Sequence, residues 1–445
     1  MKKIKLLSAA ALAAMALASF VGCNEKKAAA SKEVKIGEGF TTNLIKVNIW
    51  DNNQREGLQK IADEWTAKSG VKVSIEVVDW DNYWTLLEAG ASGGQMPDVF
   101  WMHSNTVQMY MENDLLLNLD PYIAADKSID MSRYYDGIKN LYTRKDGKVF
   151  AVPKDHDTIA LLYNKAIFDK YGVAYPNDNW TYEDMYEAAK KITEASNGTV
   201  YGYAVDTSNN QDGWYNMVYA YGGKVITDDH KSTTIGSDAG KAGMEMVRKI
   251  LTVSAPQTVV SETSNDVLFK SGKVAMVTQG SWMINSFYTS ENAKDYAWAM
   301  LPYADLNKNG KCEKNERWSA YNGLGWAASY NTKDPNAAWG LIAYFCSQVG
   351  QKEQSELGVT MAGMYGESAA FANAFKGMDV SAFTKIEENG SLYFRPYTRN
   401  TPVWEDGLKK KGAFLDAWQN PNDTAVMAKA CENAQALITK AISEE

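Results

Sequence analysis

Cysteine and histidine are scarce in this chain of 445 residues. The three histidines are His103, His156 and His230. They are not close in the sequence and show no ligand spacing on a helix, so a zinc site has no support. Beyond Cys23, the remaining cysteines are Cys312, Cys346 and Cys431. An odd number at no metal-ligand spacing allows one disulfide bond and excludes a disulfide framework.

The chain also lacks a basic run and, after its first 23 residues, any apolar run long enough to cross a bilayer. Its formal net charge is −8 at pH 7. An acidic surface repels a phosphate backbone, so nucleic acid is excluded as a partner. A chain of this length with no second long apolar segment is expected to fold into two domains outside the membrane.

The N-terminus has the pattern of a secretion signal. Lys2, Lys3 and Lys5 precede an unbroken run of apolar or small residues at 6–20. A positive start, a short apolar run and small residues before the cut predict a signal peptide over residues 1–22. The protein is therefore expected outside the cytoplasm.

Residues 20–23 (FVGC) are similar to a bacterial lipobox, in which the cysteine receives lipid and becomes the new N-terminus. Phe20 departs from the commonest form, where leucine is usual. We predict lipidation at Cys23, which would make the protein a membrane-anchored lipoprotein of the cell envelope. Residues 23–45 contain little that could be buried and are expected to form a flexible tether. The alternative is an ordinary signal peptide that ends near a cysteine.

Aromatic residues are abundant, with 14 Trp and 25 Tyr. Many lie in polar surroundings and not in periodic apolar runs. Flat rings edged by polar atoms suit sugars, whose C–H faces stack on the ring while their hydroxyls form hydrogen bonds. For any single tryptophan, burial in the core is the simpler interpretation.

The body of the chain alternates between strand and helix patterns, which predicts an α/β fold with parallel strands. Strands are expected at residues 46–50, 71–78 and 98–101, with helices at 58–65 and 83–89. Ligands of such folds bind beyond the carboxyl ends of the strands. Polar and aromatic residues gather at these strand ends, including Trp50 and Trp80. The candidate site residues among them are Asn53, Asp81, Trp101 and His103.

A second α/β unit is expected to begin near residue 155. The apolar residues 159–163 and 269–277 predict strands, and residues 318–328 look like another strand entry. Thr181 with Asp184 three residues later predicts a helix start. Asp334-Pro335 predicts another helix start, and residues 425–442 predict a final helix.

These segments resemble the extracellular solute-binding proteins of bacterial ABC importers, in particular the class that binds maltose and other oligosaccharides. The resemblance is carried by residues 49–65, 94–101 (GQMPDVFW), 114–122 (DLLLNLDPY), 152–153 (VP), 162–165 (LYNK), 269–276 (FKSGKVAM), 280–282 (GSW) and 301–302 (LP). It implies a two-lobed periplasmic-binding-protein fold of the maltose-binding type, with three chain crossings, a hinge and an interlobe cleft. The implied lobes are 46–153 plus 315–348, and 154–314 plus 349–445.

The resemblance also implies a ligand site. Trp282 and Trp404 fall where sugar-binding relatives stack rings on the ligand, and Trp101 with Asn53 and Gln54 matches ligand loops of the first lobe. Asp155, His156 and Asp157 fall where the chain first crosses between the lobes. The sequence does not decide which of these side chains points into the cleft. The remaining candidates are Trp214, Tyr321, Asn322 and Arg395. The implied function is capture of a carbohydrate by a monomer and its delivery to an ABC permease, without catalysis and without a required cofactor.

Residues 305–316 match a calcium-binding loop. The pattern has oxygen ligands at positions 1, 3, 5 and 12 and glycine at position 6. The corresponding ligands are Asp305, Asn307, Asn309 and Glu316. A structural calcium ion is therefore expected there. The alternative is an ordinary polar turn, because residues 301–303 (LPY) stand where an EF-hand would have a helix.

Two other functional classes compete with solute binding. A secreted glycoside hydrolase needs two carboxylates, for which Glu405 with Asp406, or Asp155 with Asp157, would be available. A surface adhesin would bind no small ligand. Saturable sugar binding without turnover would separate solute binding from both.

Overall fold

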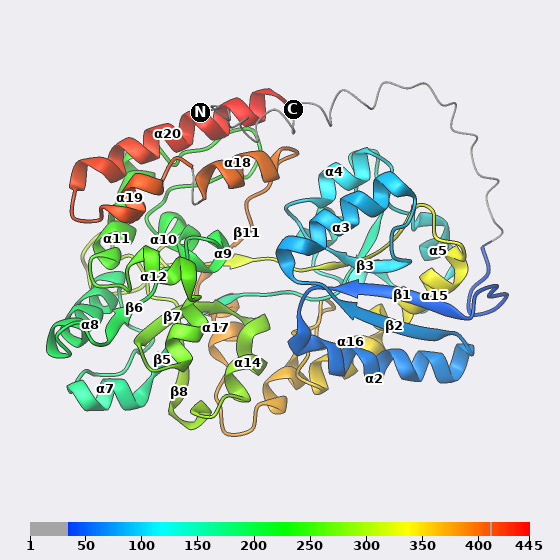
Figure 1. Cartoon of the computed structure of the whole chain (residues 1–445), viewed down its shortest axis with the longest axis horizontal. Coiled ribbons are helices and arrows are strands. Elements are labelled where there is room, and N and C mark those ends of the chain that lie inside the picture. Colours follow the sequence, from blue (N-terminus) through cyan, green and yellow to red (C-terminus); the bar gives the residue numbers. More distant parts are fainter. Residues whose placement is uncertain (1–33, 410–411) are drawn as a thin grey trace, which may run out of the picture. The chain divides into compact units, whose positions relative to one another are not determined.

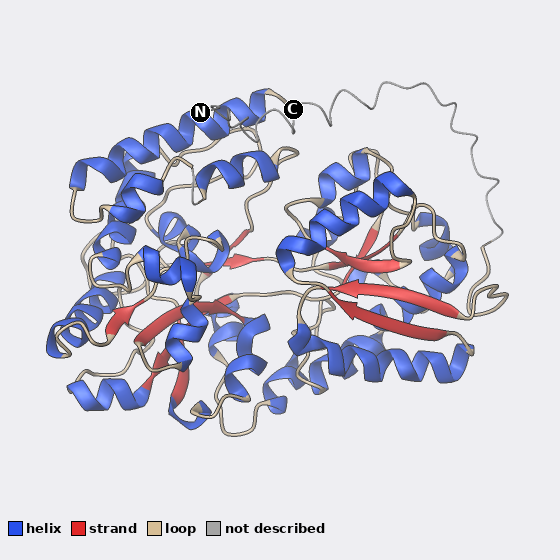
Figure 2. Ribbon diagram, viewed as in Figure 1, coloured by secondary structure: helices blue, strands red, loops and turns tan. Residues whose placement is uncertain are grey.

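Two β-sheets, each surrounded by helices, organise the structure (Figure 2). The computed structural model describes residues 34–409 and 412–445, and residues 35–445 form one compact unit. The predicted leader, Cys23 and residues 24–33 of the predicted tether lie outside the described residues, whereas Leu44 and Ile45, expected at the end of the tether, belong to the first strand. The α/β class expected from the sequence is confirmed.

The first lobe is built on the five-stranded sheet, with strand order β2-β1-β3-β10-β4 (Figure 1). Its strands are β1 (Leu44–Ile49), β2 (Lys72–Val77), β3 (Val99–Met102), β4 (Ala151–Pro153) and β10 (Gly325–Ala328). β1 pairs in parallel with β2 and β3, and β10 is antiparallel to β3 and β4. Its helices are α2 (Asn52–Ser69), α3 (Trp80–Gly93), α4 (Val107–Glu112), α5 (Asp120–Ala125), η2 (Met131–Arg133), α6 (Asp136–Leu141), α15 (Pro335–Cys346) and α16 (Gln348–Glu356).

Helix α2 illustrates how the sequence sets these elements. Asp51 caps its start by accepting a hydrogen bond from the backbone N–H of Asn53, and Gly70 ends it with a φ of 75°. Leu58, Ile61, Ala62 and Trp65 recur at helical spacing and are buried. The helix therefore packs one apolar face against the sheet and positions its N-terminus at the end of β1.

The second lobe is built on the four-stranded sheet, with strand order β6-β7-β5-β8. Its strands are β5 (Ile159–Asn164), β6 (Tyr201–Tyr203), β7 (Val274–Gly280) and β8 (Tyr296–Met300). Its helices up to β8 are α7 (Lys165–Tyr171), α8 (Tyr182–Ala195), α9 (Asn210–Gly213), α10 (Tyr215–Ala220), α11 (Asp238–Leu251), α12 (Gln257–Glu262), α13 (Asn265–Lys270), η3 (Ser281–Met283), α14 (Ile284–Tyr288) and η4 (Ala293–Asp295). The predicted capping box of Thr181 and Asp184 is present at the start of α8.

The C-terminal region adds further helices to the second lobe. They are η5 (Ser368–Ala374), α17 (Ala382–Asn389), α18 (Thr401–Leu408), α19 (Leu415–Gln419) and α20 (Thr424–Ser443). A separate parallel pair, β9 (Trp318–Tyr321) with β11 (Ser391–Phe394), packs near β5 and α10. Among the described residues, no helix is both long and apolar enough to cross a membrane.

Three segments connect the two sheets, and we call them the crossing segments: residues 154–158, 322–324 and 357–367. Isolated bridges join Asp157 to Asn322 and Asp155 to Ala362, so the three segments run side by side. Helix α16 packs on α2 of the first lobe, whereas β9 packs on the second lobe. The lobe boundaries expected at 153, 315 and 348 stay predictions.

Candidate functional site

The first crossing segment, residues 154–158, is buried along its whole length. Asp155 accepts a hydrogen bond from the backbone N–H of Leu324 (2.6 Å) and pairs with Lys154 (2.5 Å). Lys154 is fully buried, donates to Gln54 Oε1 (2.8 Å) and holds its Nζ 4.7 Å from the centre of the Trp101 ring. The charge of Asp155 is therefore already matched inside the protein.

Asp157 has no such partner. Its Oδ1 accepts a hydrogen bond from Ser281 Oγ (2.8 Å), at the end of β7. Burial, followed by the nearby charge of Asp155, raises the pKa of Asp157 to about 7. At neutral pH this carboxyl group can therefore either donate or accept a hydrogen bond.

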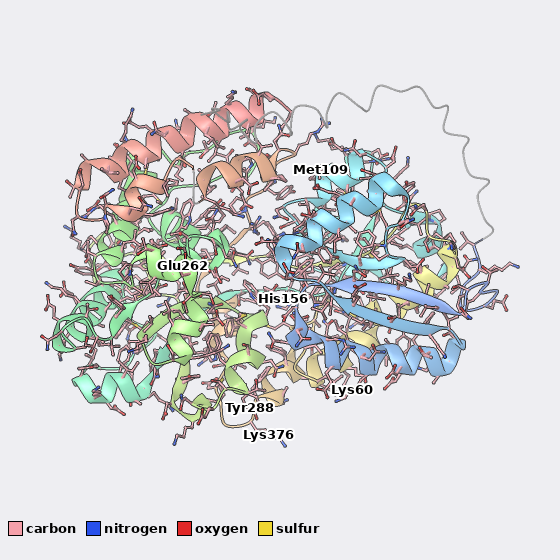
Figure 3. All side chains as sticks on the ribbon, viewed as in Figure 1. Lys60, Met109, His156, Glu262, Tyr288 and Lys376 are labelled. Atoms are coloured by element: carbon pink, nitrogen blue, oxygen red, sulfur yellow. The ribbon has the colours of Figure 1, made fainter. Side chains whose placement is uncertain are left out.

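His156, which Figure 3 labels, is buried in the same segment. Its Nδ1 lies 2.6 Å from the carbonyl oxygen of Ala362 and its Nε2 lies 3.0 Å from Glu387 Oε1. Its ring stacks on Tyr321 at a centroid distance of 5.6 Å. Burial alone would lower the pKa of His156, but the hydrogen bond and charge of Glu387 outweigh it and raise the pKa. His156 and Tyr321 thus pack on each other, whereas Asp157 is held by Ser281.

Tryptophans gather at the carboxyl ends of β1, β2 and β3. Trp50 makes edge contacts with Trp80 (5.1 Å between centroids) and Trp101 (4.9 Å), and Trp80 makes one with His103 (5.3 Å). Trp84, one helical turn after Trp80, packs on both Trp50 and Trp80. Trp101 is fully buried, whereas the other three tryptophans are partly exposed. We call these four residues and His103 the tryptophan cluster.

Of the tryptophan cluster, sequence reasoning named Trp101 and His103 as site residues and placed Trp50 and Trp80 at the expected ligand-binding edge, but missed Trp84. The available signal was the pair Trp80 and Trp84, spaced four residues apart at the start of a helix that follows a strand. That spacing places both rings on one helix face. Parallel pairing of β1 with β2 and β3 then brings Trp50 and Trp101 to the same edge.

Buried amides link the two lobes beside this cluster. Asn322 Nδ2 lies 3.2 Å from His103 Nε2 and 3.3 Å from Gln211 Oε1. Asn322 Oδ1 and Gln211 Nε2 are buried without a hydrogen-bond partner. Burial and then the charge of Arg395 lower the pKa of His103, so its ring is neutral at pH 7. An unmatched acceptor and an unmatched donor therefore lie next to each other.

Arg395 and Glu405 form a buried ion pair in the second lobe. Arg395 Nη2 lies 2.7 Å and 2.9 Å from the two oxygens of Glu405, which also accepts a hydrogen bond from Tyr215 Oη (3.0 Å). Arg395 Nη1 and Asp212 Oδ1 are buried without partners. Burial, and then the charge of Asp206, raises the pKa of Asp212 well above its usual range. These groups extend the set of unmatched donors and acceptors.

The other predicted aromatic residues are placed differently. Trp404 is fully buried with its Nε1 donating to Thr398 Oγ1 (3.1 Å), and Trp214 is buried with its Nε1 donating to Asn210 Oδ1 (2.8 Å). In contrast to the stacking expected for Trp404, neither ring has a face open to a ligand in this structure. Trp282 is only partly buried, and its ring lies across Gly280, where any Cβ would collide with it.

Asn53 and Asp81 are exposed. The backbone carbonyl of Asn53 accepts a hydrogen bond from Asn285 Nδ2 (3.4 Å) of α14. Gln54 is buried and is held by Lys154 and Asp51. Their roles toward a ligand stay predictions.

The loop over residues 305–316 is tightly turned. Asp305 accepts hydrogen bonds from the backbone N–H groups of Asn309 and Gly310, and buried Glu316 accepts from those of Leu306 and Glu313. In the part of the chain that the structure describes, no three His, Cys, Asp or Glu side chains form a metal-binding group. The calcium ion stays a prediction. Binding it would require side-chain amide and backbone carbonyl oxygens as ligands in addition to carboxylate oxygens.

The three cysteines within the described residues are free: Cys312, Cys346 and Cys431. Cys346 and Cys431 are buried in different lobes, and Cys312 is partly exposed. The disulfide bond that the sequence allowed is therefore absent among these three residues.

Comparisons with known proteins agree with this architecture. The sequence profile of the bacterial extracellular solute-binding protein family matches residues 51–352. A structure of an ABC substrate-binding protein from Listeria monocytogenes, in complex with cycloalternan, has a TM-score of 0.79 at 20% identity, covering 90% of this chain and 99% of that one. The fold is thus a two-lobed periplasmic-binding-protein fold, as predicted. The chain belongs to the bacterial extracellular solute-binding proteins.

Relatives found by sequence are distant. A binding protein of Brucella abortus is 25% identical over 248 residues, which is 54% of this chain and 58% of the relative. The chain thus spans little more than half the length of that relative. The maltotriose-binding protein of Pyrococcus abyssi is 26% identical over 331 residues, covering 71% of this chain and 64% of the relative.

Proposed function

We propose that this protein captures a neutral carbohydrate between its two lobes and delivers it to the permease of an ABC importer. The observation that carries the proposal is the partly exposed tryptophan cluster next to the buried, unmatched groups of Asn322 and Gln211. Rings offer stacking faces, and a sugar hydroxyl can satisfy a donor and an acceptor at once. The names of the Listeria and Pyrococcus relatives, which mention cycloalternan and maltotriose, support a saccharide.

The charges at the site favour a neutral ligand. Arg395 is paired with Glu405, and Lys154 with Asp155, so neither cation is left to balance an anionic ligand. Asp157 and Asp212 are buried carboxyl groups without a cation bonded to them, and their raised pKa values mean that they can carry a proton. A phosphate or carboxylate ligand would be repelled whenever either group is ionised.

A glycoside hydrolase is less well supported. Glu405 is bonded to Arg395 and Tyr215, and Asp155 is bonded to Lys154 and Leu324. Asp406, the proposed companion of Glu405, is exposed. Neither pair named from the sequence leaves two carboxyl groups available for acid and nucleophile or base.

A thermal-shift screen tests the proposal directly. Mono- and oligosaccharides should be screened, because a ligand that binds only the native state at a hundredfold excess over its dissociation constant adds about 2.7 kcal/mol of stability. We expect a neutral saccharide to raise the melting temperature and the corresponding sugar phosphate to leave it unchanged. Release of reducing ends during incubation would favour the hydrolase, and a panel without any shift would contradict carbohydrate binding.

The expected location of the protein in the cell is inferred from residues 1–23, which lie outside the described part of the chain. We infer that residues 1–22 direct export and that Cys23 carries lipid, which would hold the folded body at the membrane surface as a monomer. The family's extracellular character supports this setting.

A further inference from the structure

A short segment of the second lobe reaches across to the first lobe. It comprises residues 394–399, from the last residue of β11 towards the start of α18 (Figure 1), and we call it the strap. Two of its side chains, Arg395 and Thr398, are buried. Arg395 is paired with Glu405, and the backbone N–H of Thr398 donates to Thr401 Oγ1 (2.7 Å). The strap is therefore fixed to α18 of the second lobe by buried contacts.

Other side chains of the strap contact the first lobe. Arg399 Nε lies 2.5 Å from Oε2 of Glu112, the last residue of α4. The Phe394 ring lies against Gly137 of α6, where any Cβ would collide with it. Among the described residues, no backbone hydrogen bond joins the strap to α4 or α6. Side chains alone therefore make the contact between the strap and these two helices.

The contacts with the first lobe can separate at little cost. The Arg399 side chain is 48% exposed and that of Glu112 is 21% exposed, so water solvates both charges when they part. Phe394 is 45% exposed and can leave Gly137 without opening the apolar core. The buried pair of Arg395 and Glu405 differs, because parting it would leave two uncompensated charges inside the second lobe. The strap is thus permanently attached to one lobe and reversibly attached to the other.

The strap also borders the proposed ligand site. Arg395 Nη1 is one of the buried groups without a hydrogen-bond partner at that site. Burial, and then the charge of Arg395, lowers the pKa of His103 in the tryptophan cluster, which indicates that the two side chains lie near each other. Because His103 belongs to the first lobe and Arg395 to the second, the strap joins the lobes beside the groups that are proposed to meet the ligand.

We propose that Phe394 and Arg399 are positioning residues: by contacting Gly137 and Glu112 they hold the two lobes together and set the fraction of molecules in the closed form. A ligand that binds between the lobes has an apparent affinity proportional to this fraction. The effect on affinity rests on the proposed carbohydrate-binding function, whereas the effect on the ligand-free protein does not. These side chains therefore tune binding without touching the ligand.

The test reverses the charge on the first lobe. Glu112→Arg places two guanidinium groups opposite each other, and combining it with Arg399→Glu exchanges the charges and keeps the pair. Glu56→Arg, at an exposed glutamate of α2 that pairs with Lys60 (3.5 Å), is the matched control. Small-angle X-ray scattering of the ligand-free protein measures how far the lobes are apart, and calorimetry with maltotriose measures affinity. Melting temperatures check that all variants fold.

We expect Glu112→Arg to increase the radius of gyration and to weaken maltotriose binding by roughly threefold or more, with little change in melting temperature. The exchanged pair should restore both values, and Glu56→Arg should change neither. Unchanged scattering in Glu112→Arg, or no recovery in the exchanged pair, overturns the role of the strap. Absence of maltotriose binding in every variant counts against the proposed function alone, because scattering without ligand still decides the role of the strap.

Discussion

At the scale of single residues, Trp282 shows how a backbone position can determine where an aromatic ring lies. Gly280 has no Cβ, and this leaves room for the Trp282 ring to lie across the end of β7. Ser281, between them, is buried and donates its hydroxyl to Asp157. Residues 280–282 (GSW) thus place a glycine without a side chain, a serine hydroxyl and a tryptophan ring beside the first crossing segment.

We predict that Trp282→Ala weakens saccharide binding by about 1–3 kcal/mol, because a stacked ring contributes both buried area and a preferred geometry. The melting temperature without ligand should change much less, since the ring is only partly buried. Calorimetry and thermal unfolding measure the two effects. Trp318→Ala is the control, because Trp318 is also a partly buried tryptophan packed on the core of the second lobe. A large fall in melting temperature with unchanged affinity would make Trp282 a core residue.

Asp157 should give stability a pH dependence of its own. Its pKa is raised to about 7 in the native state, above the usual unfolded value of about 3.9. Between about pH 4 and 7 the native state therefore holds a proton that the unfolded state has lost, so the free energy of unfolding falls as the pH rises through this window. Above pH 7 this destabilisation is complete.

We predict that Asp157→Asn flattens this slope and raises the free energy of unfolding at pH 8 relative to pH 5, on the order of 1–3 kcal/mol compared with the wild type. Urea unfolding at several pH values measures it. Asp81→Asn, at an exposed carboxylate, should leave the slope unchanged. Identical slopes in the wild type and Asp157→Asn would show that Asp157 is ionised in the native state.

The sequence could predict which residues lie near the candidate site better than it could predict which aromatic rings have a face exposed to a ligand. Asp157, His103 and Asn322 follow strand ends or a crossing, and strand order brings them together. Whether a ring is covered depends on partners far away in the chain, as Phe414 and Trp418 show by packing on Trp214. Trp84 was missed because it lies one helical turn into α3 and not at the end of a strand.

At the scale of elements, patterns local to a few residues were the most informative. The strands expected at 46–50, 71–78 and 98–101 correspond to β1, β2 and β3, and the final helix corresponds to α20. Residues 322–324, expected as part of a strand entry, instead form a crossing segment whose backbone bonds to Asp157 and Lys154. No local pattern distinguishes a strand from an extended segment that pairs only once or twice.

The loop over residues 305–316 gives a prediction at this scale. If it holds calcium, a chelator should lower the melting temperature by a few degrees, and Asp305→Ala should abolish that effect. Asp229→Ala is the control, because Asp229 also accepts hydrogen bonds within a polar turn, from Thr227 and Lys231, but lacks the calcium pattern. Equal melting with and without chelator would make the loop an ordinary turn.

At the scale of the whole molecule, the proposed attachment to the membrane depends on one residue. We predict that Cys23→Ala yields a protein that incorporates no lipid, because the thioether requires that cysteine. Metabolic labelling with a fatty-acid analogue measures this, and Cys312→Ala, which removes a partly exposed cysteine of the folded body, should keep the label. Label on the Cys23→Ala protein would contradict the assignment.

The arrangement of the tryptophan cluster also has an optical consequence. Indoles held edge to face at centroid distances near 5 Å couple their electronic transitions, and a fixed chiral arrangement gives near-ultraviolet circular dichroism. Trp50, Trp80 and Trp84 are partly exposed, so a bound saccharide would change their surroundings without changing the peptide signal. The protein thus carries its own chromophore at the point where the ligand is expected to bind.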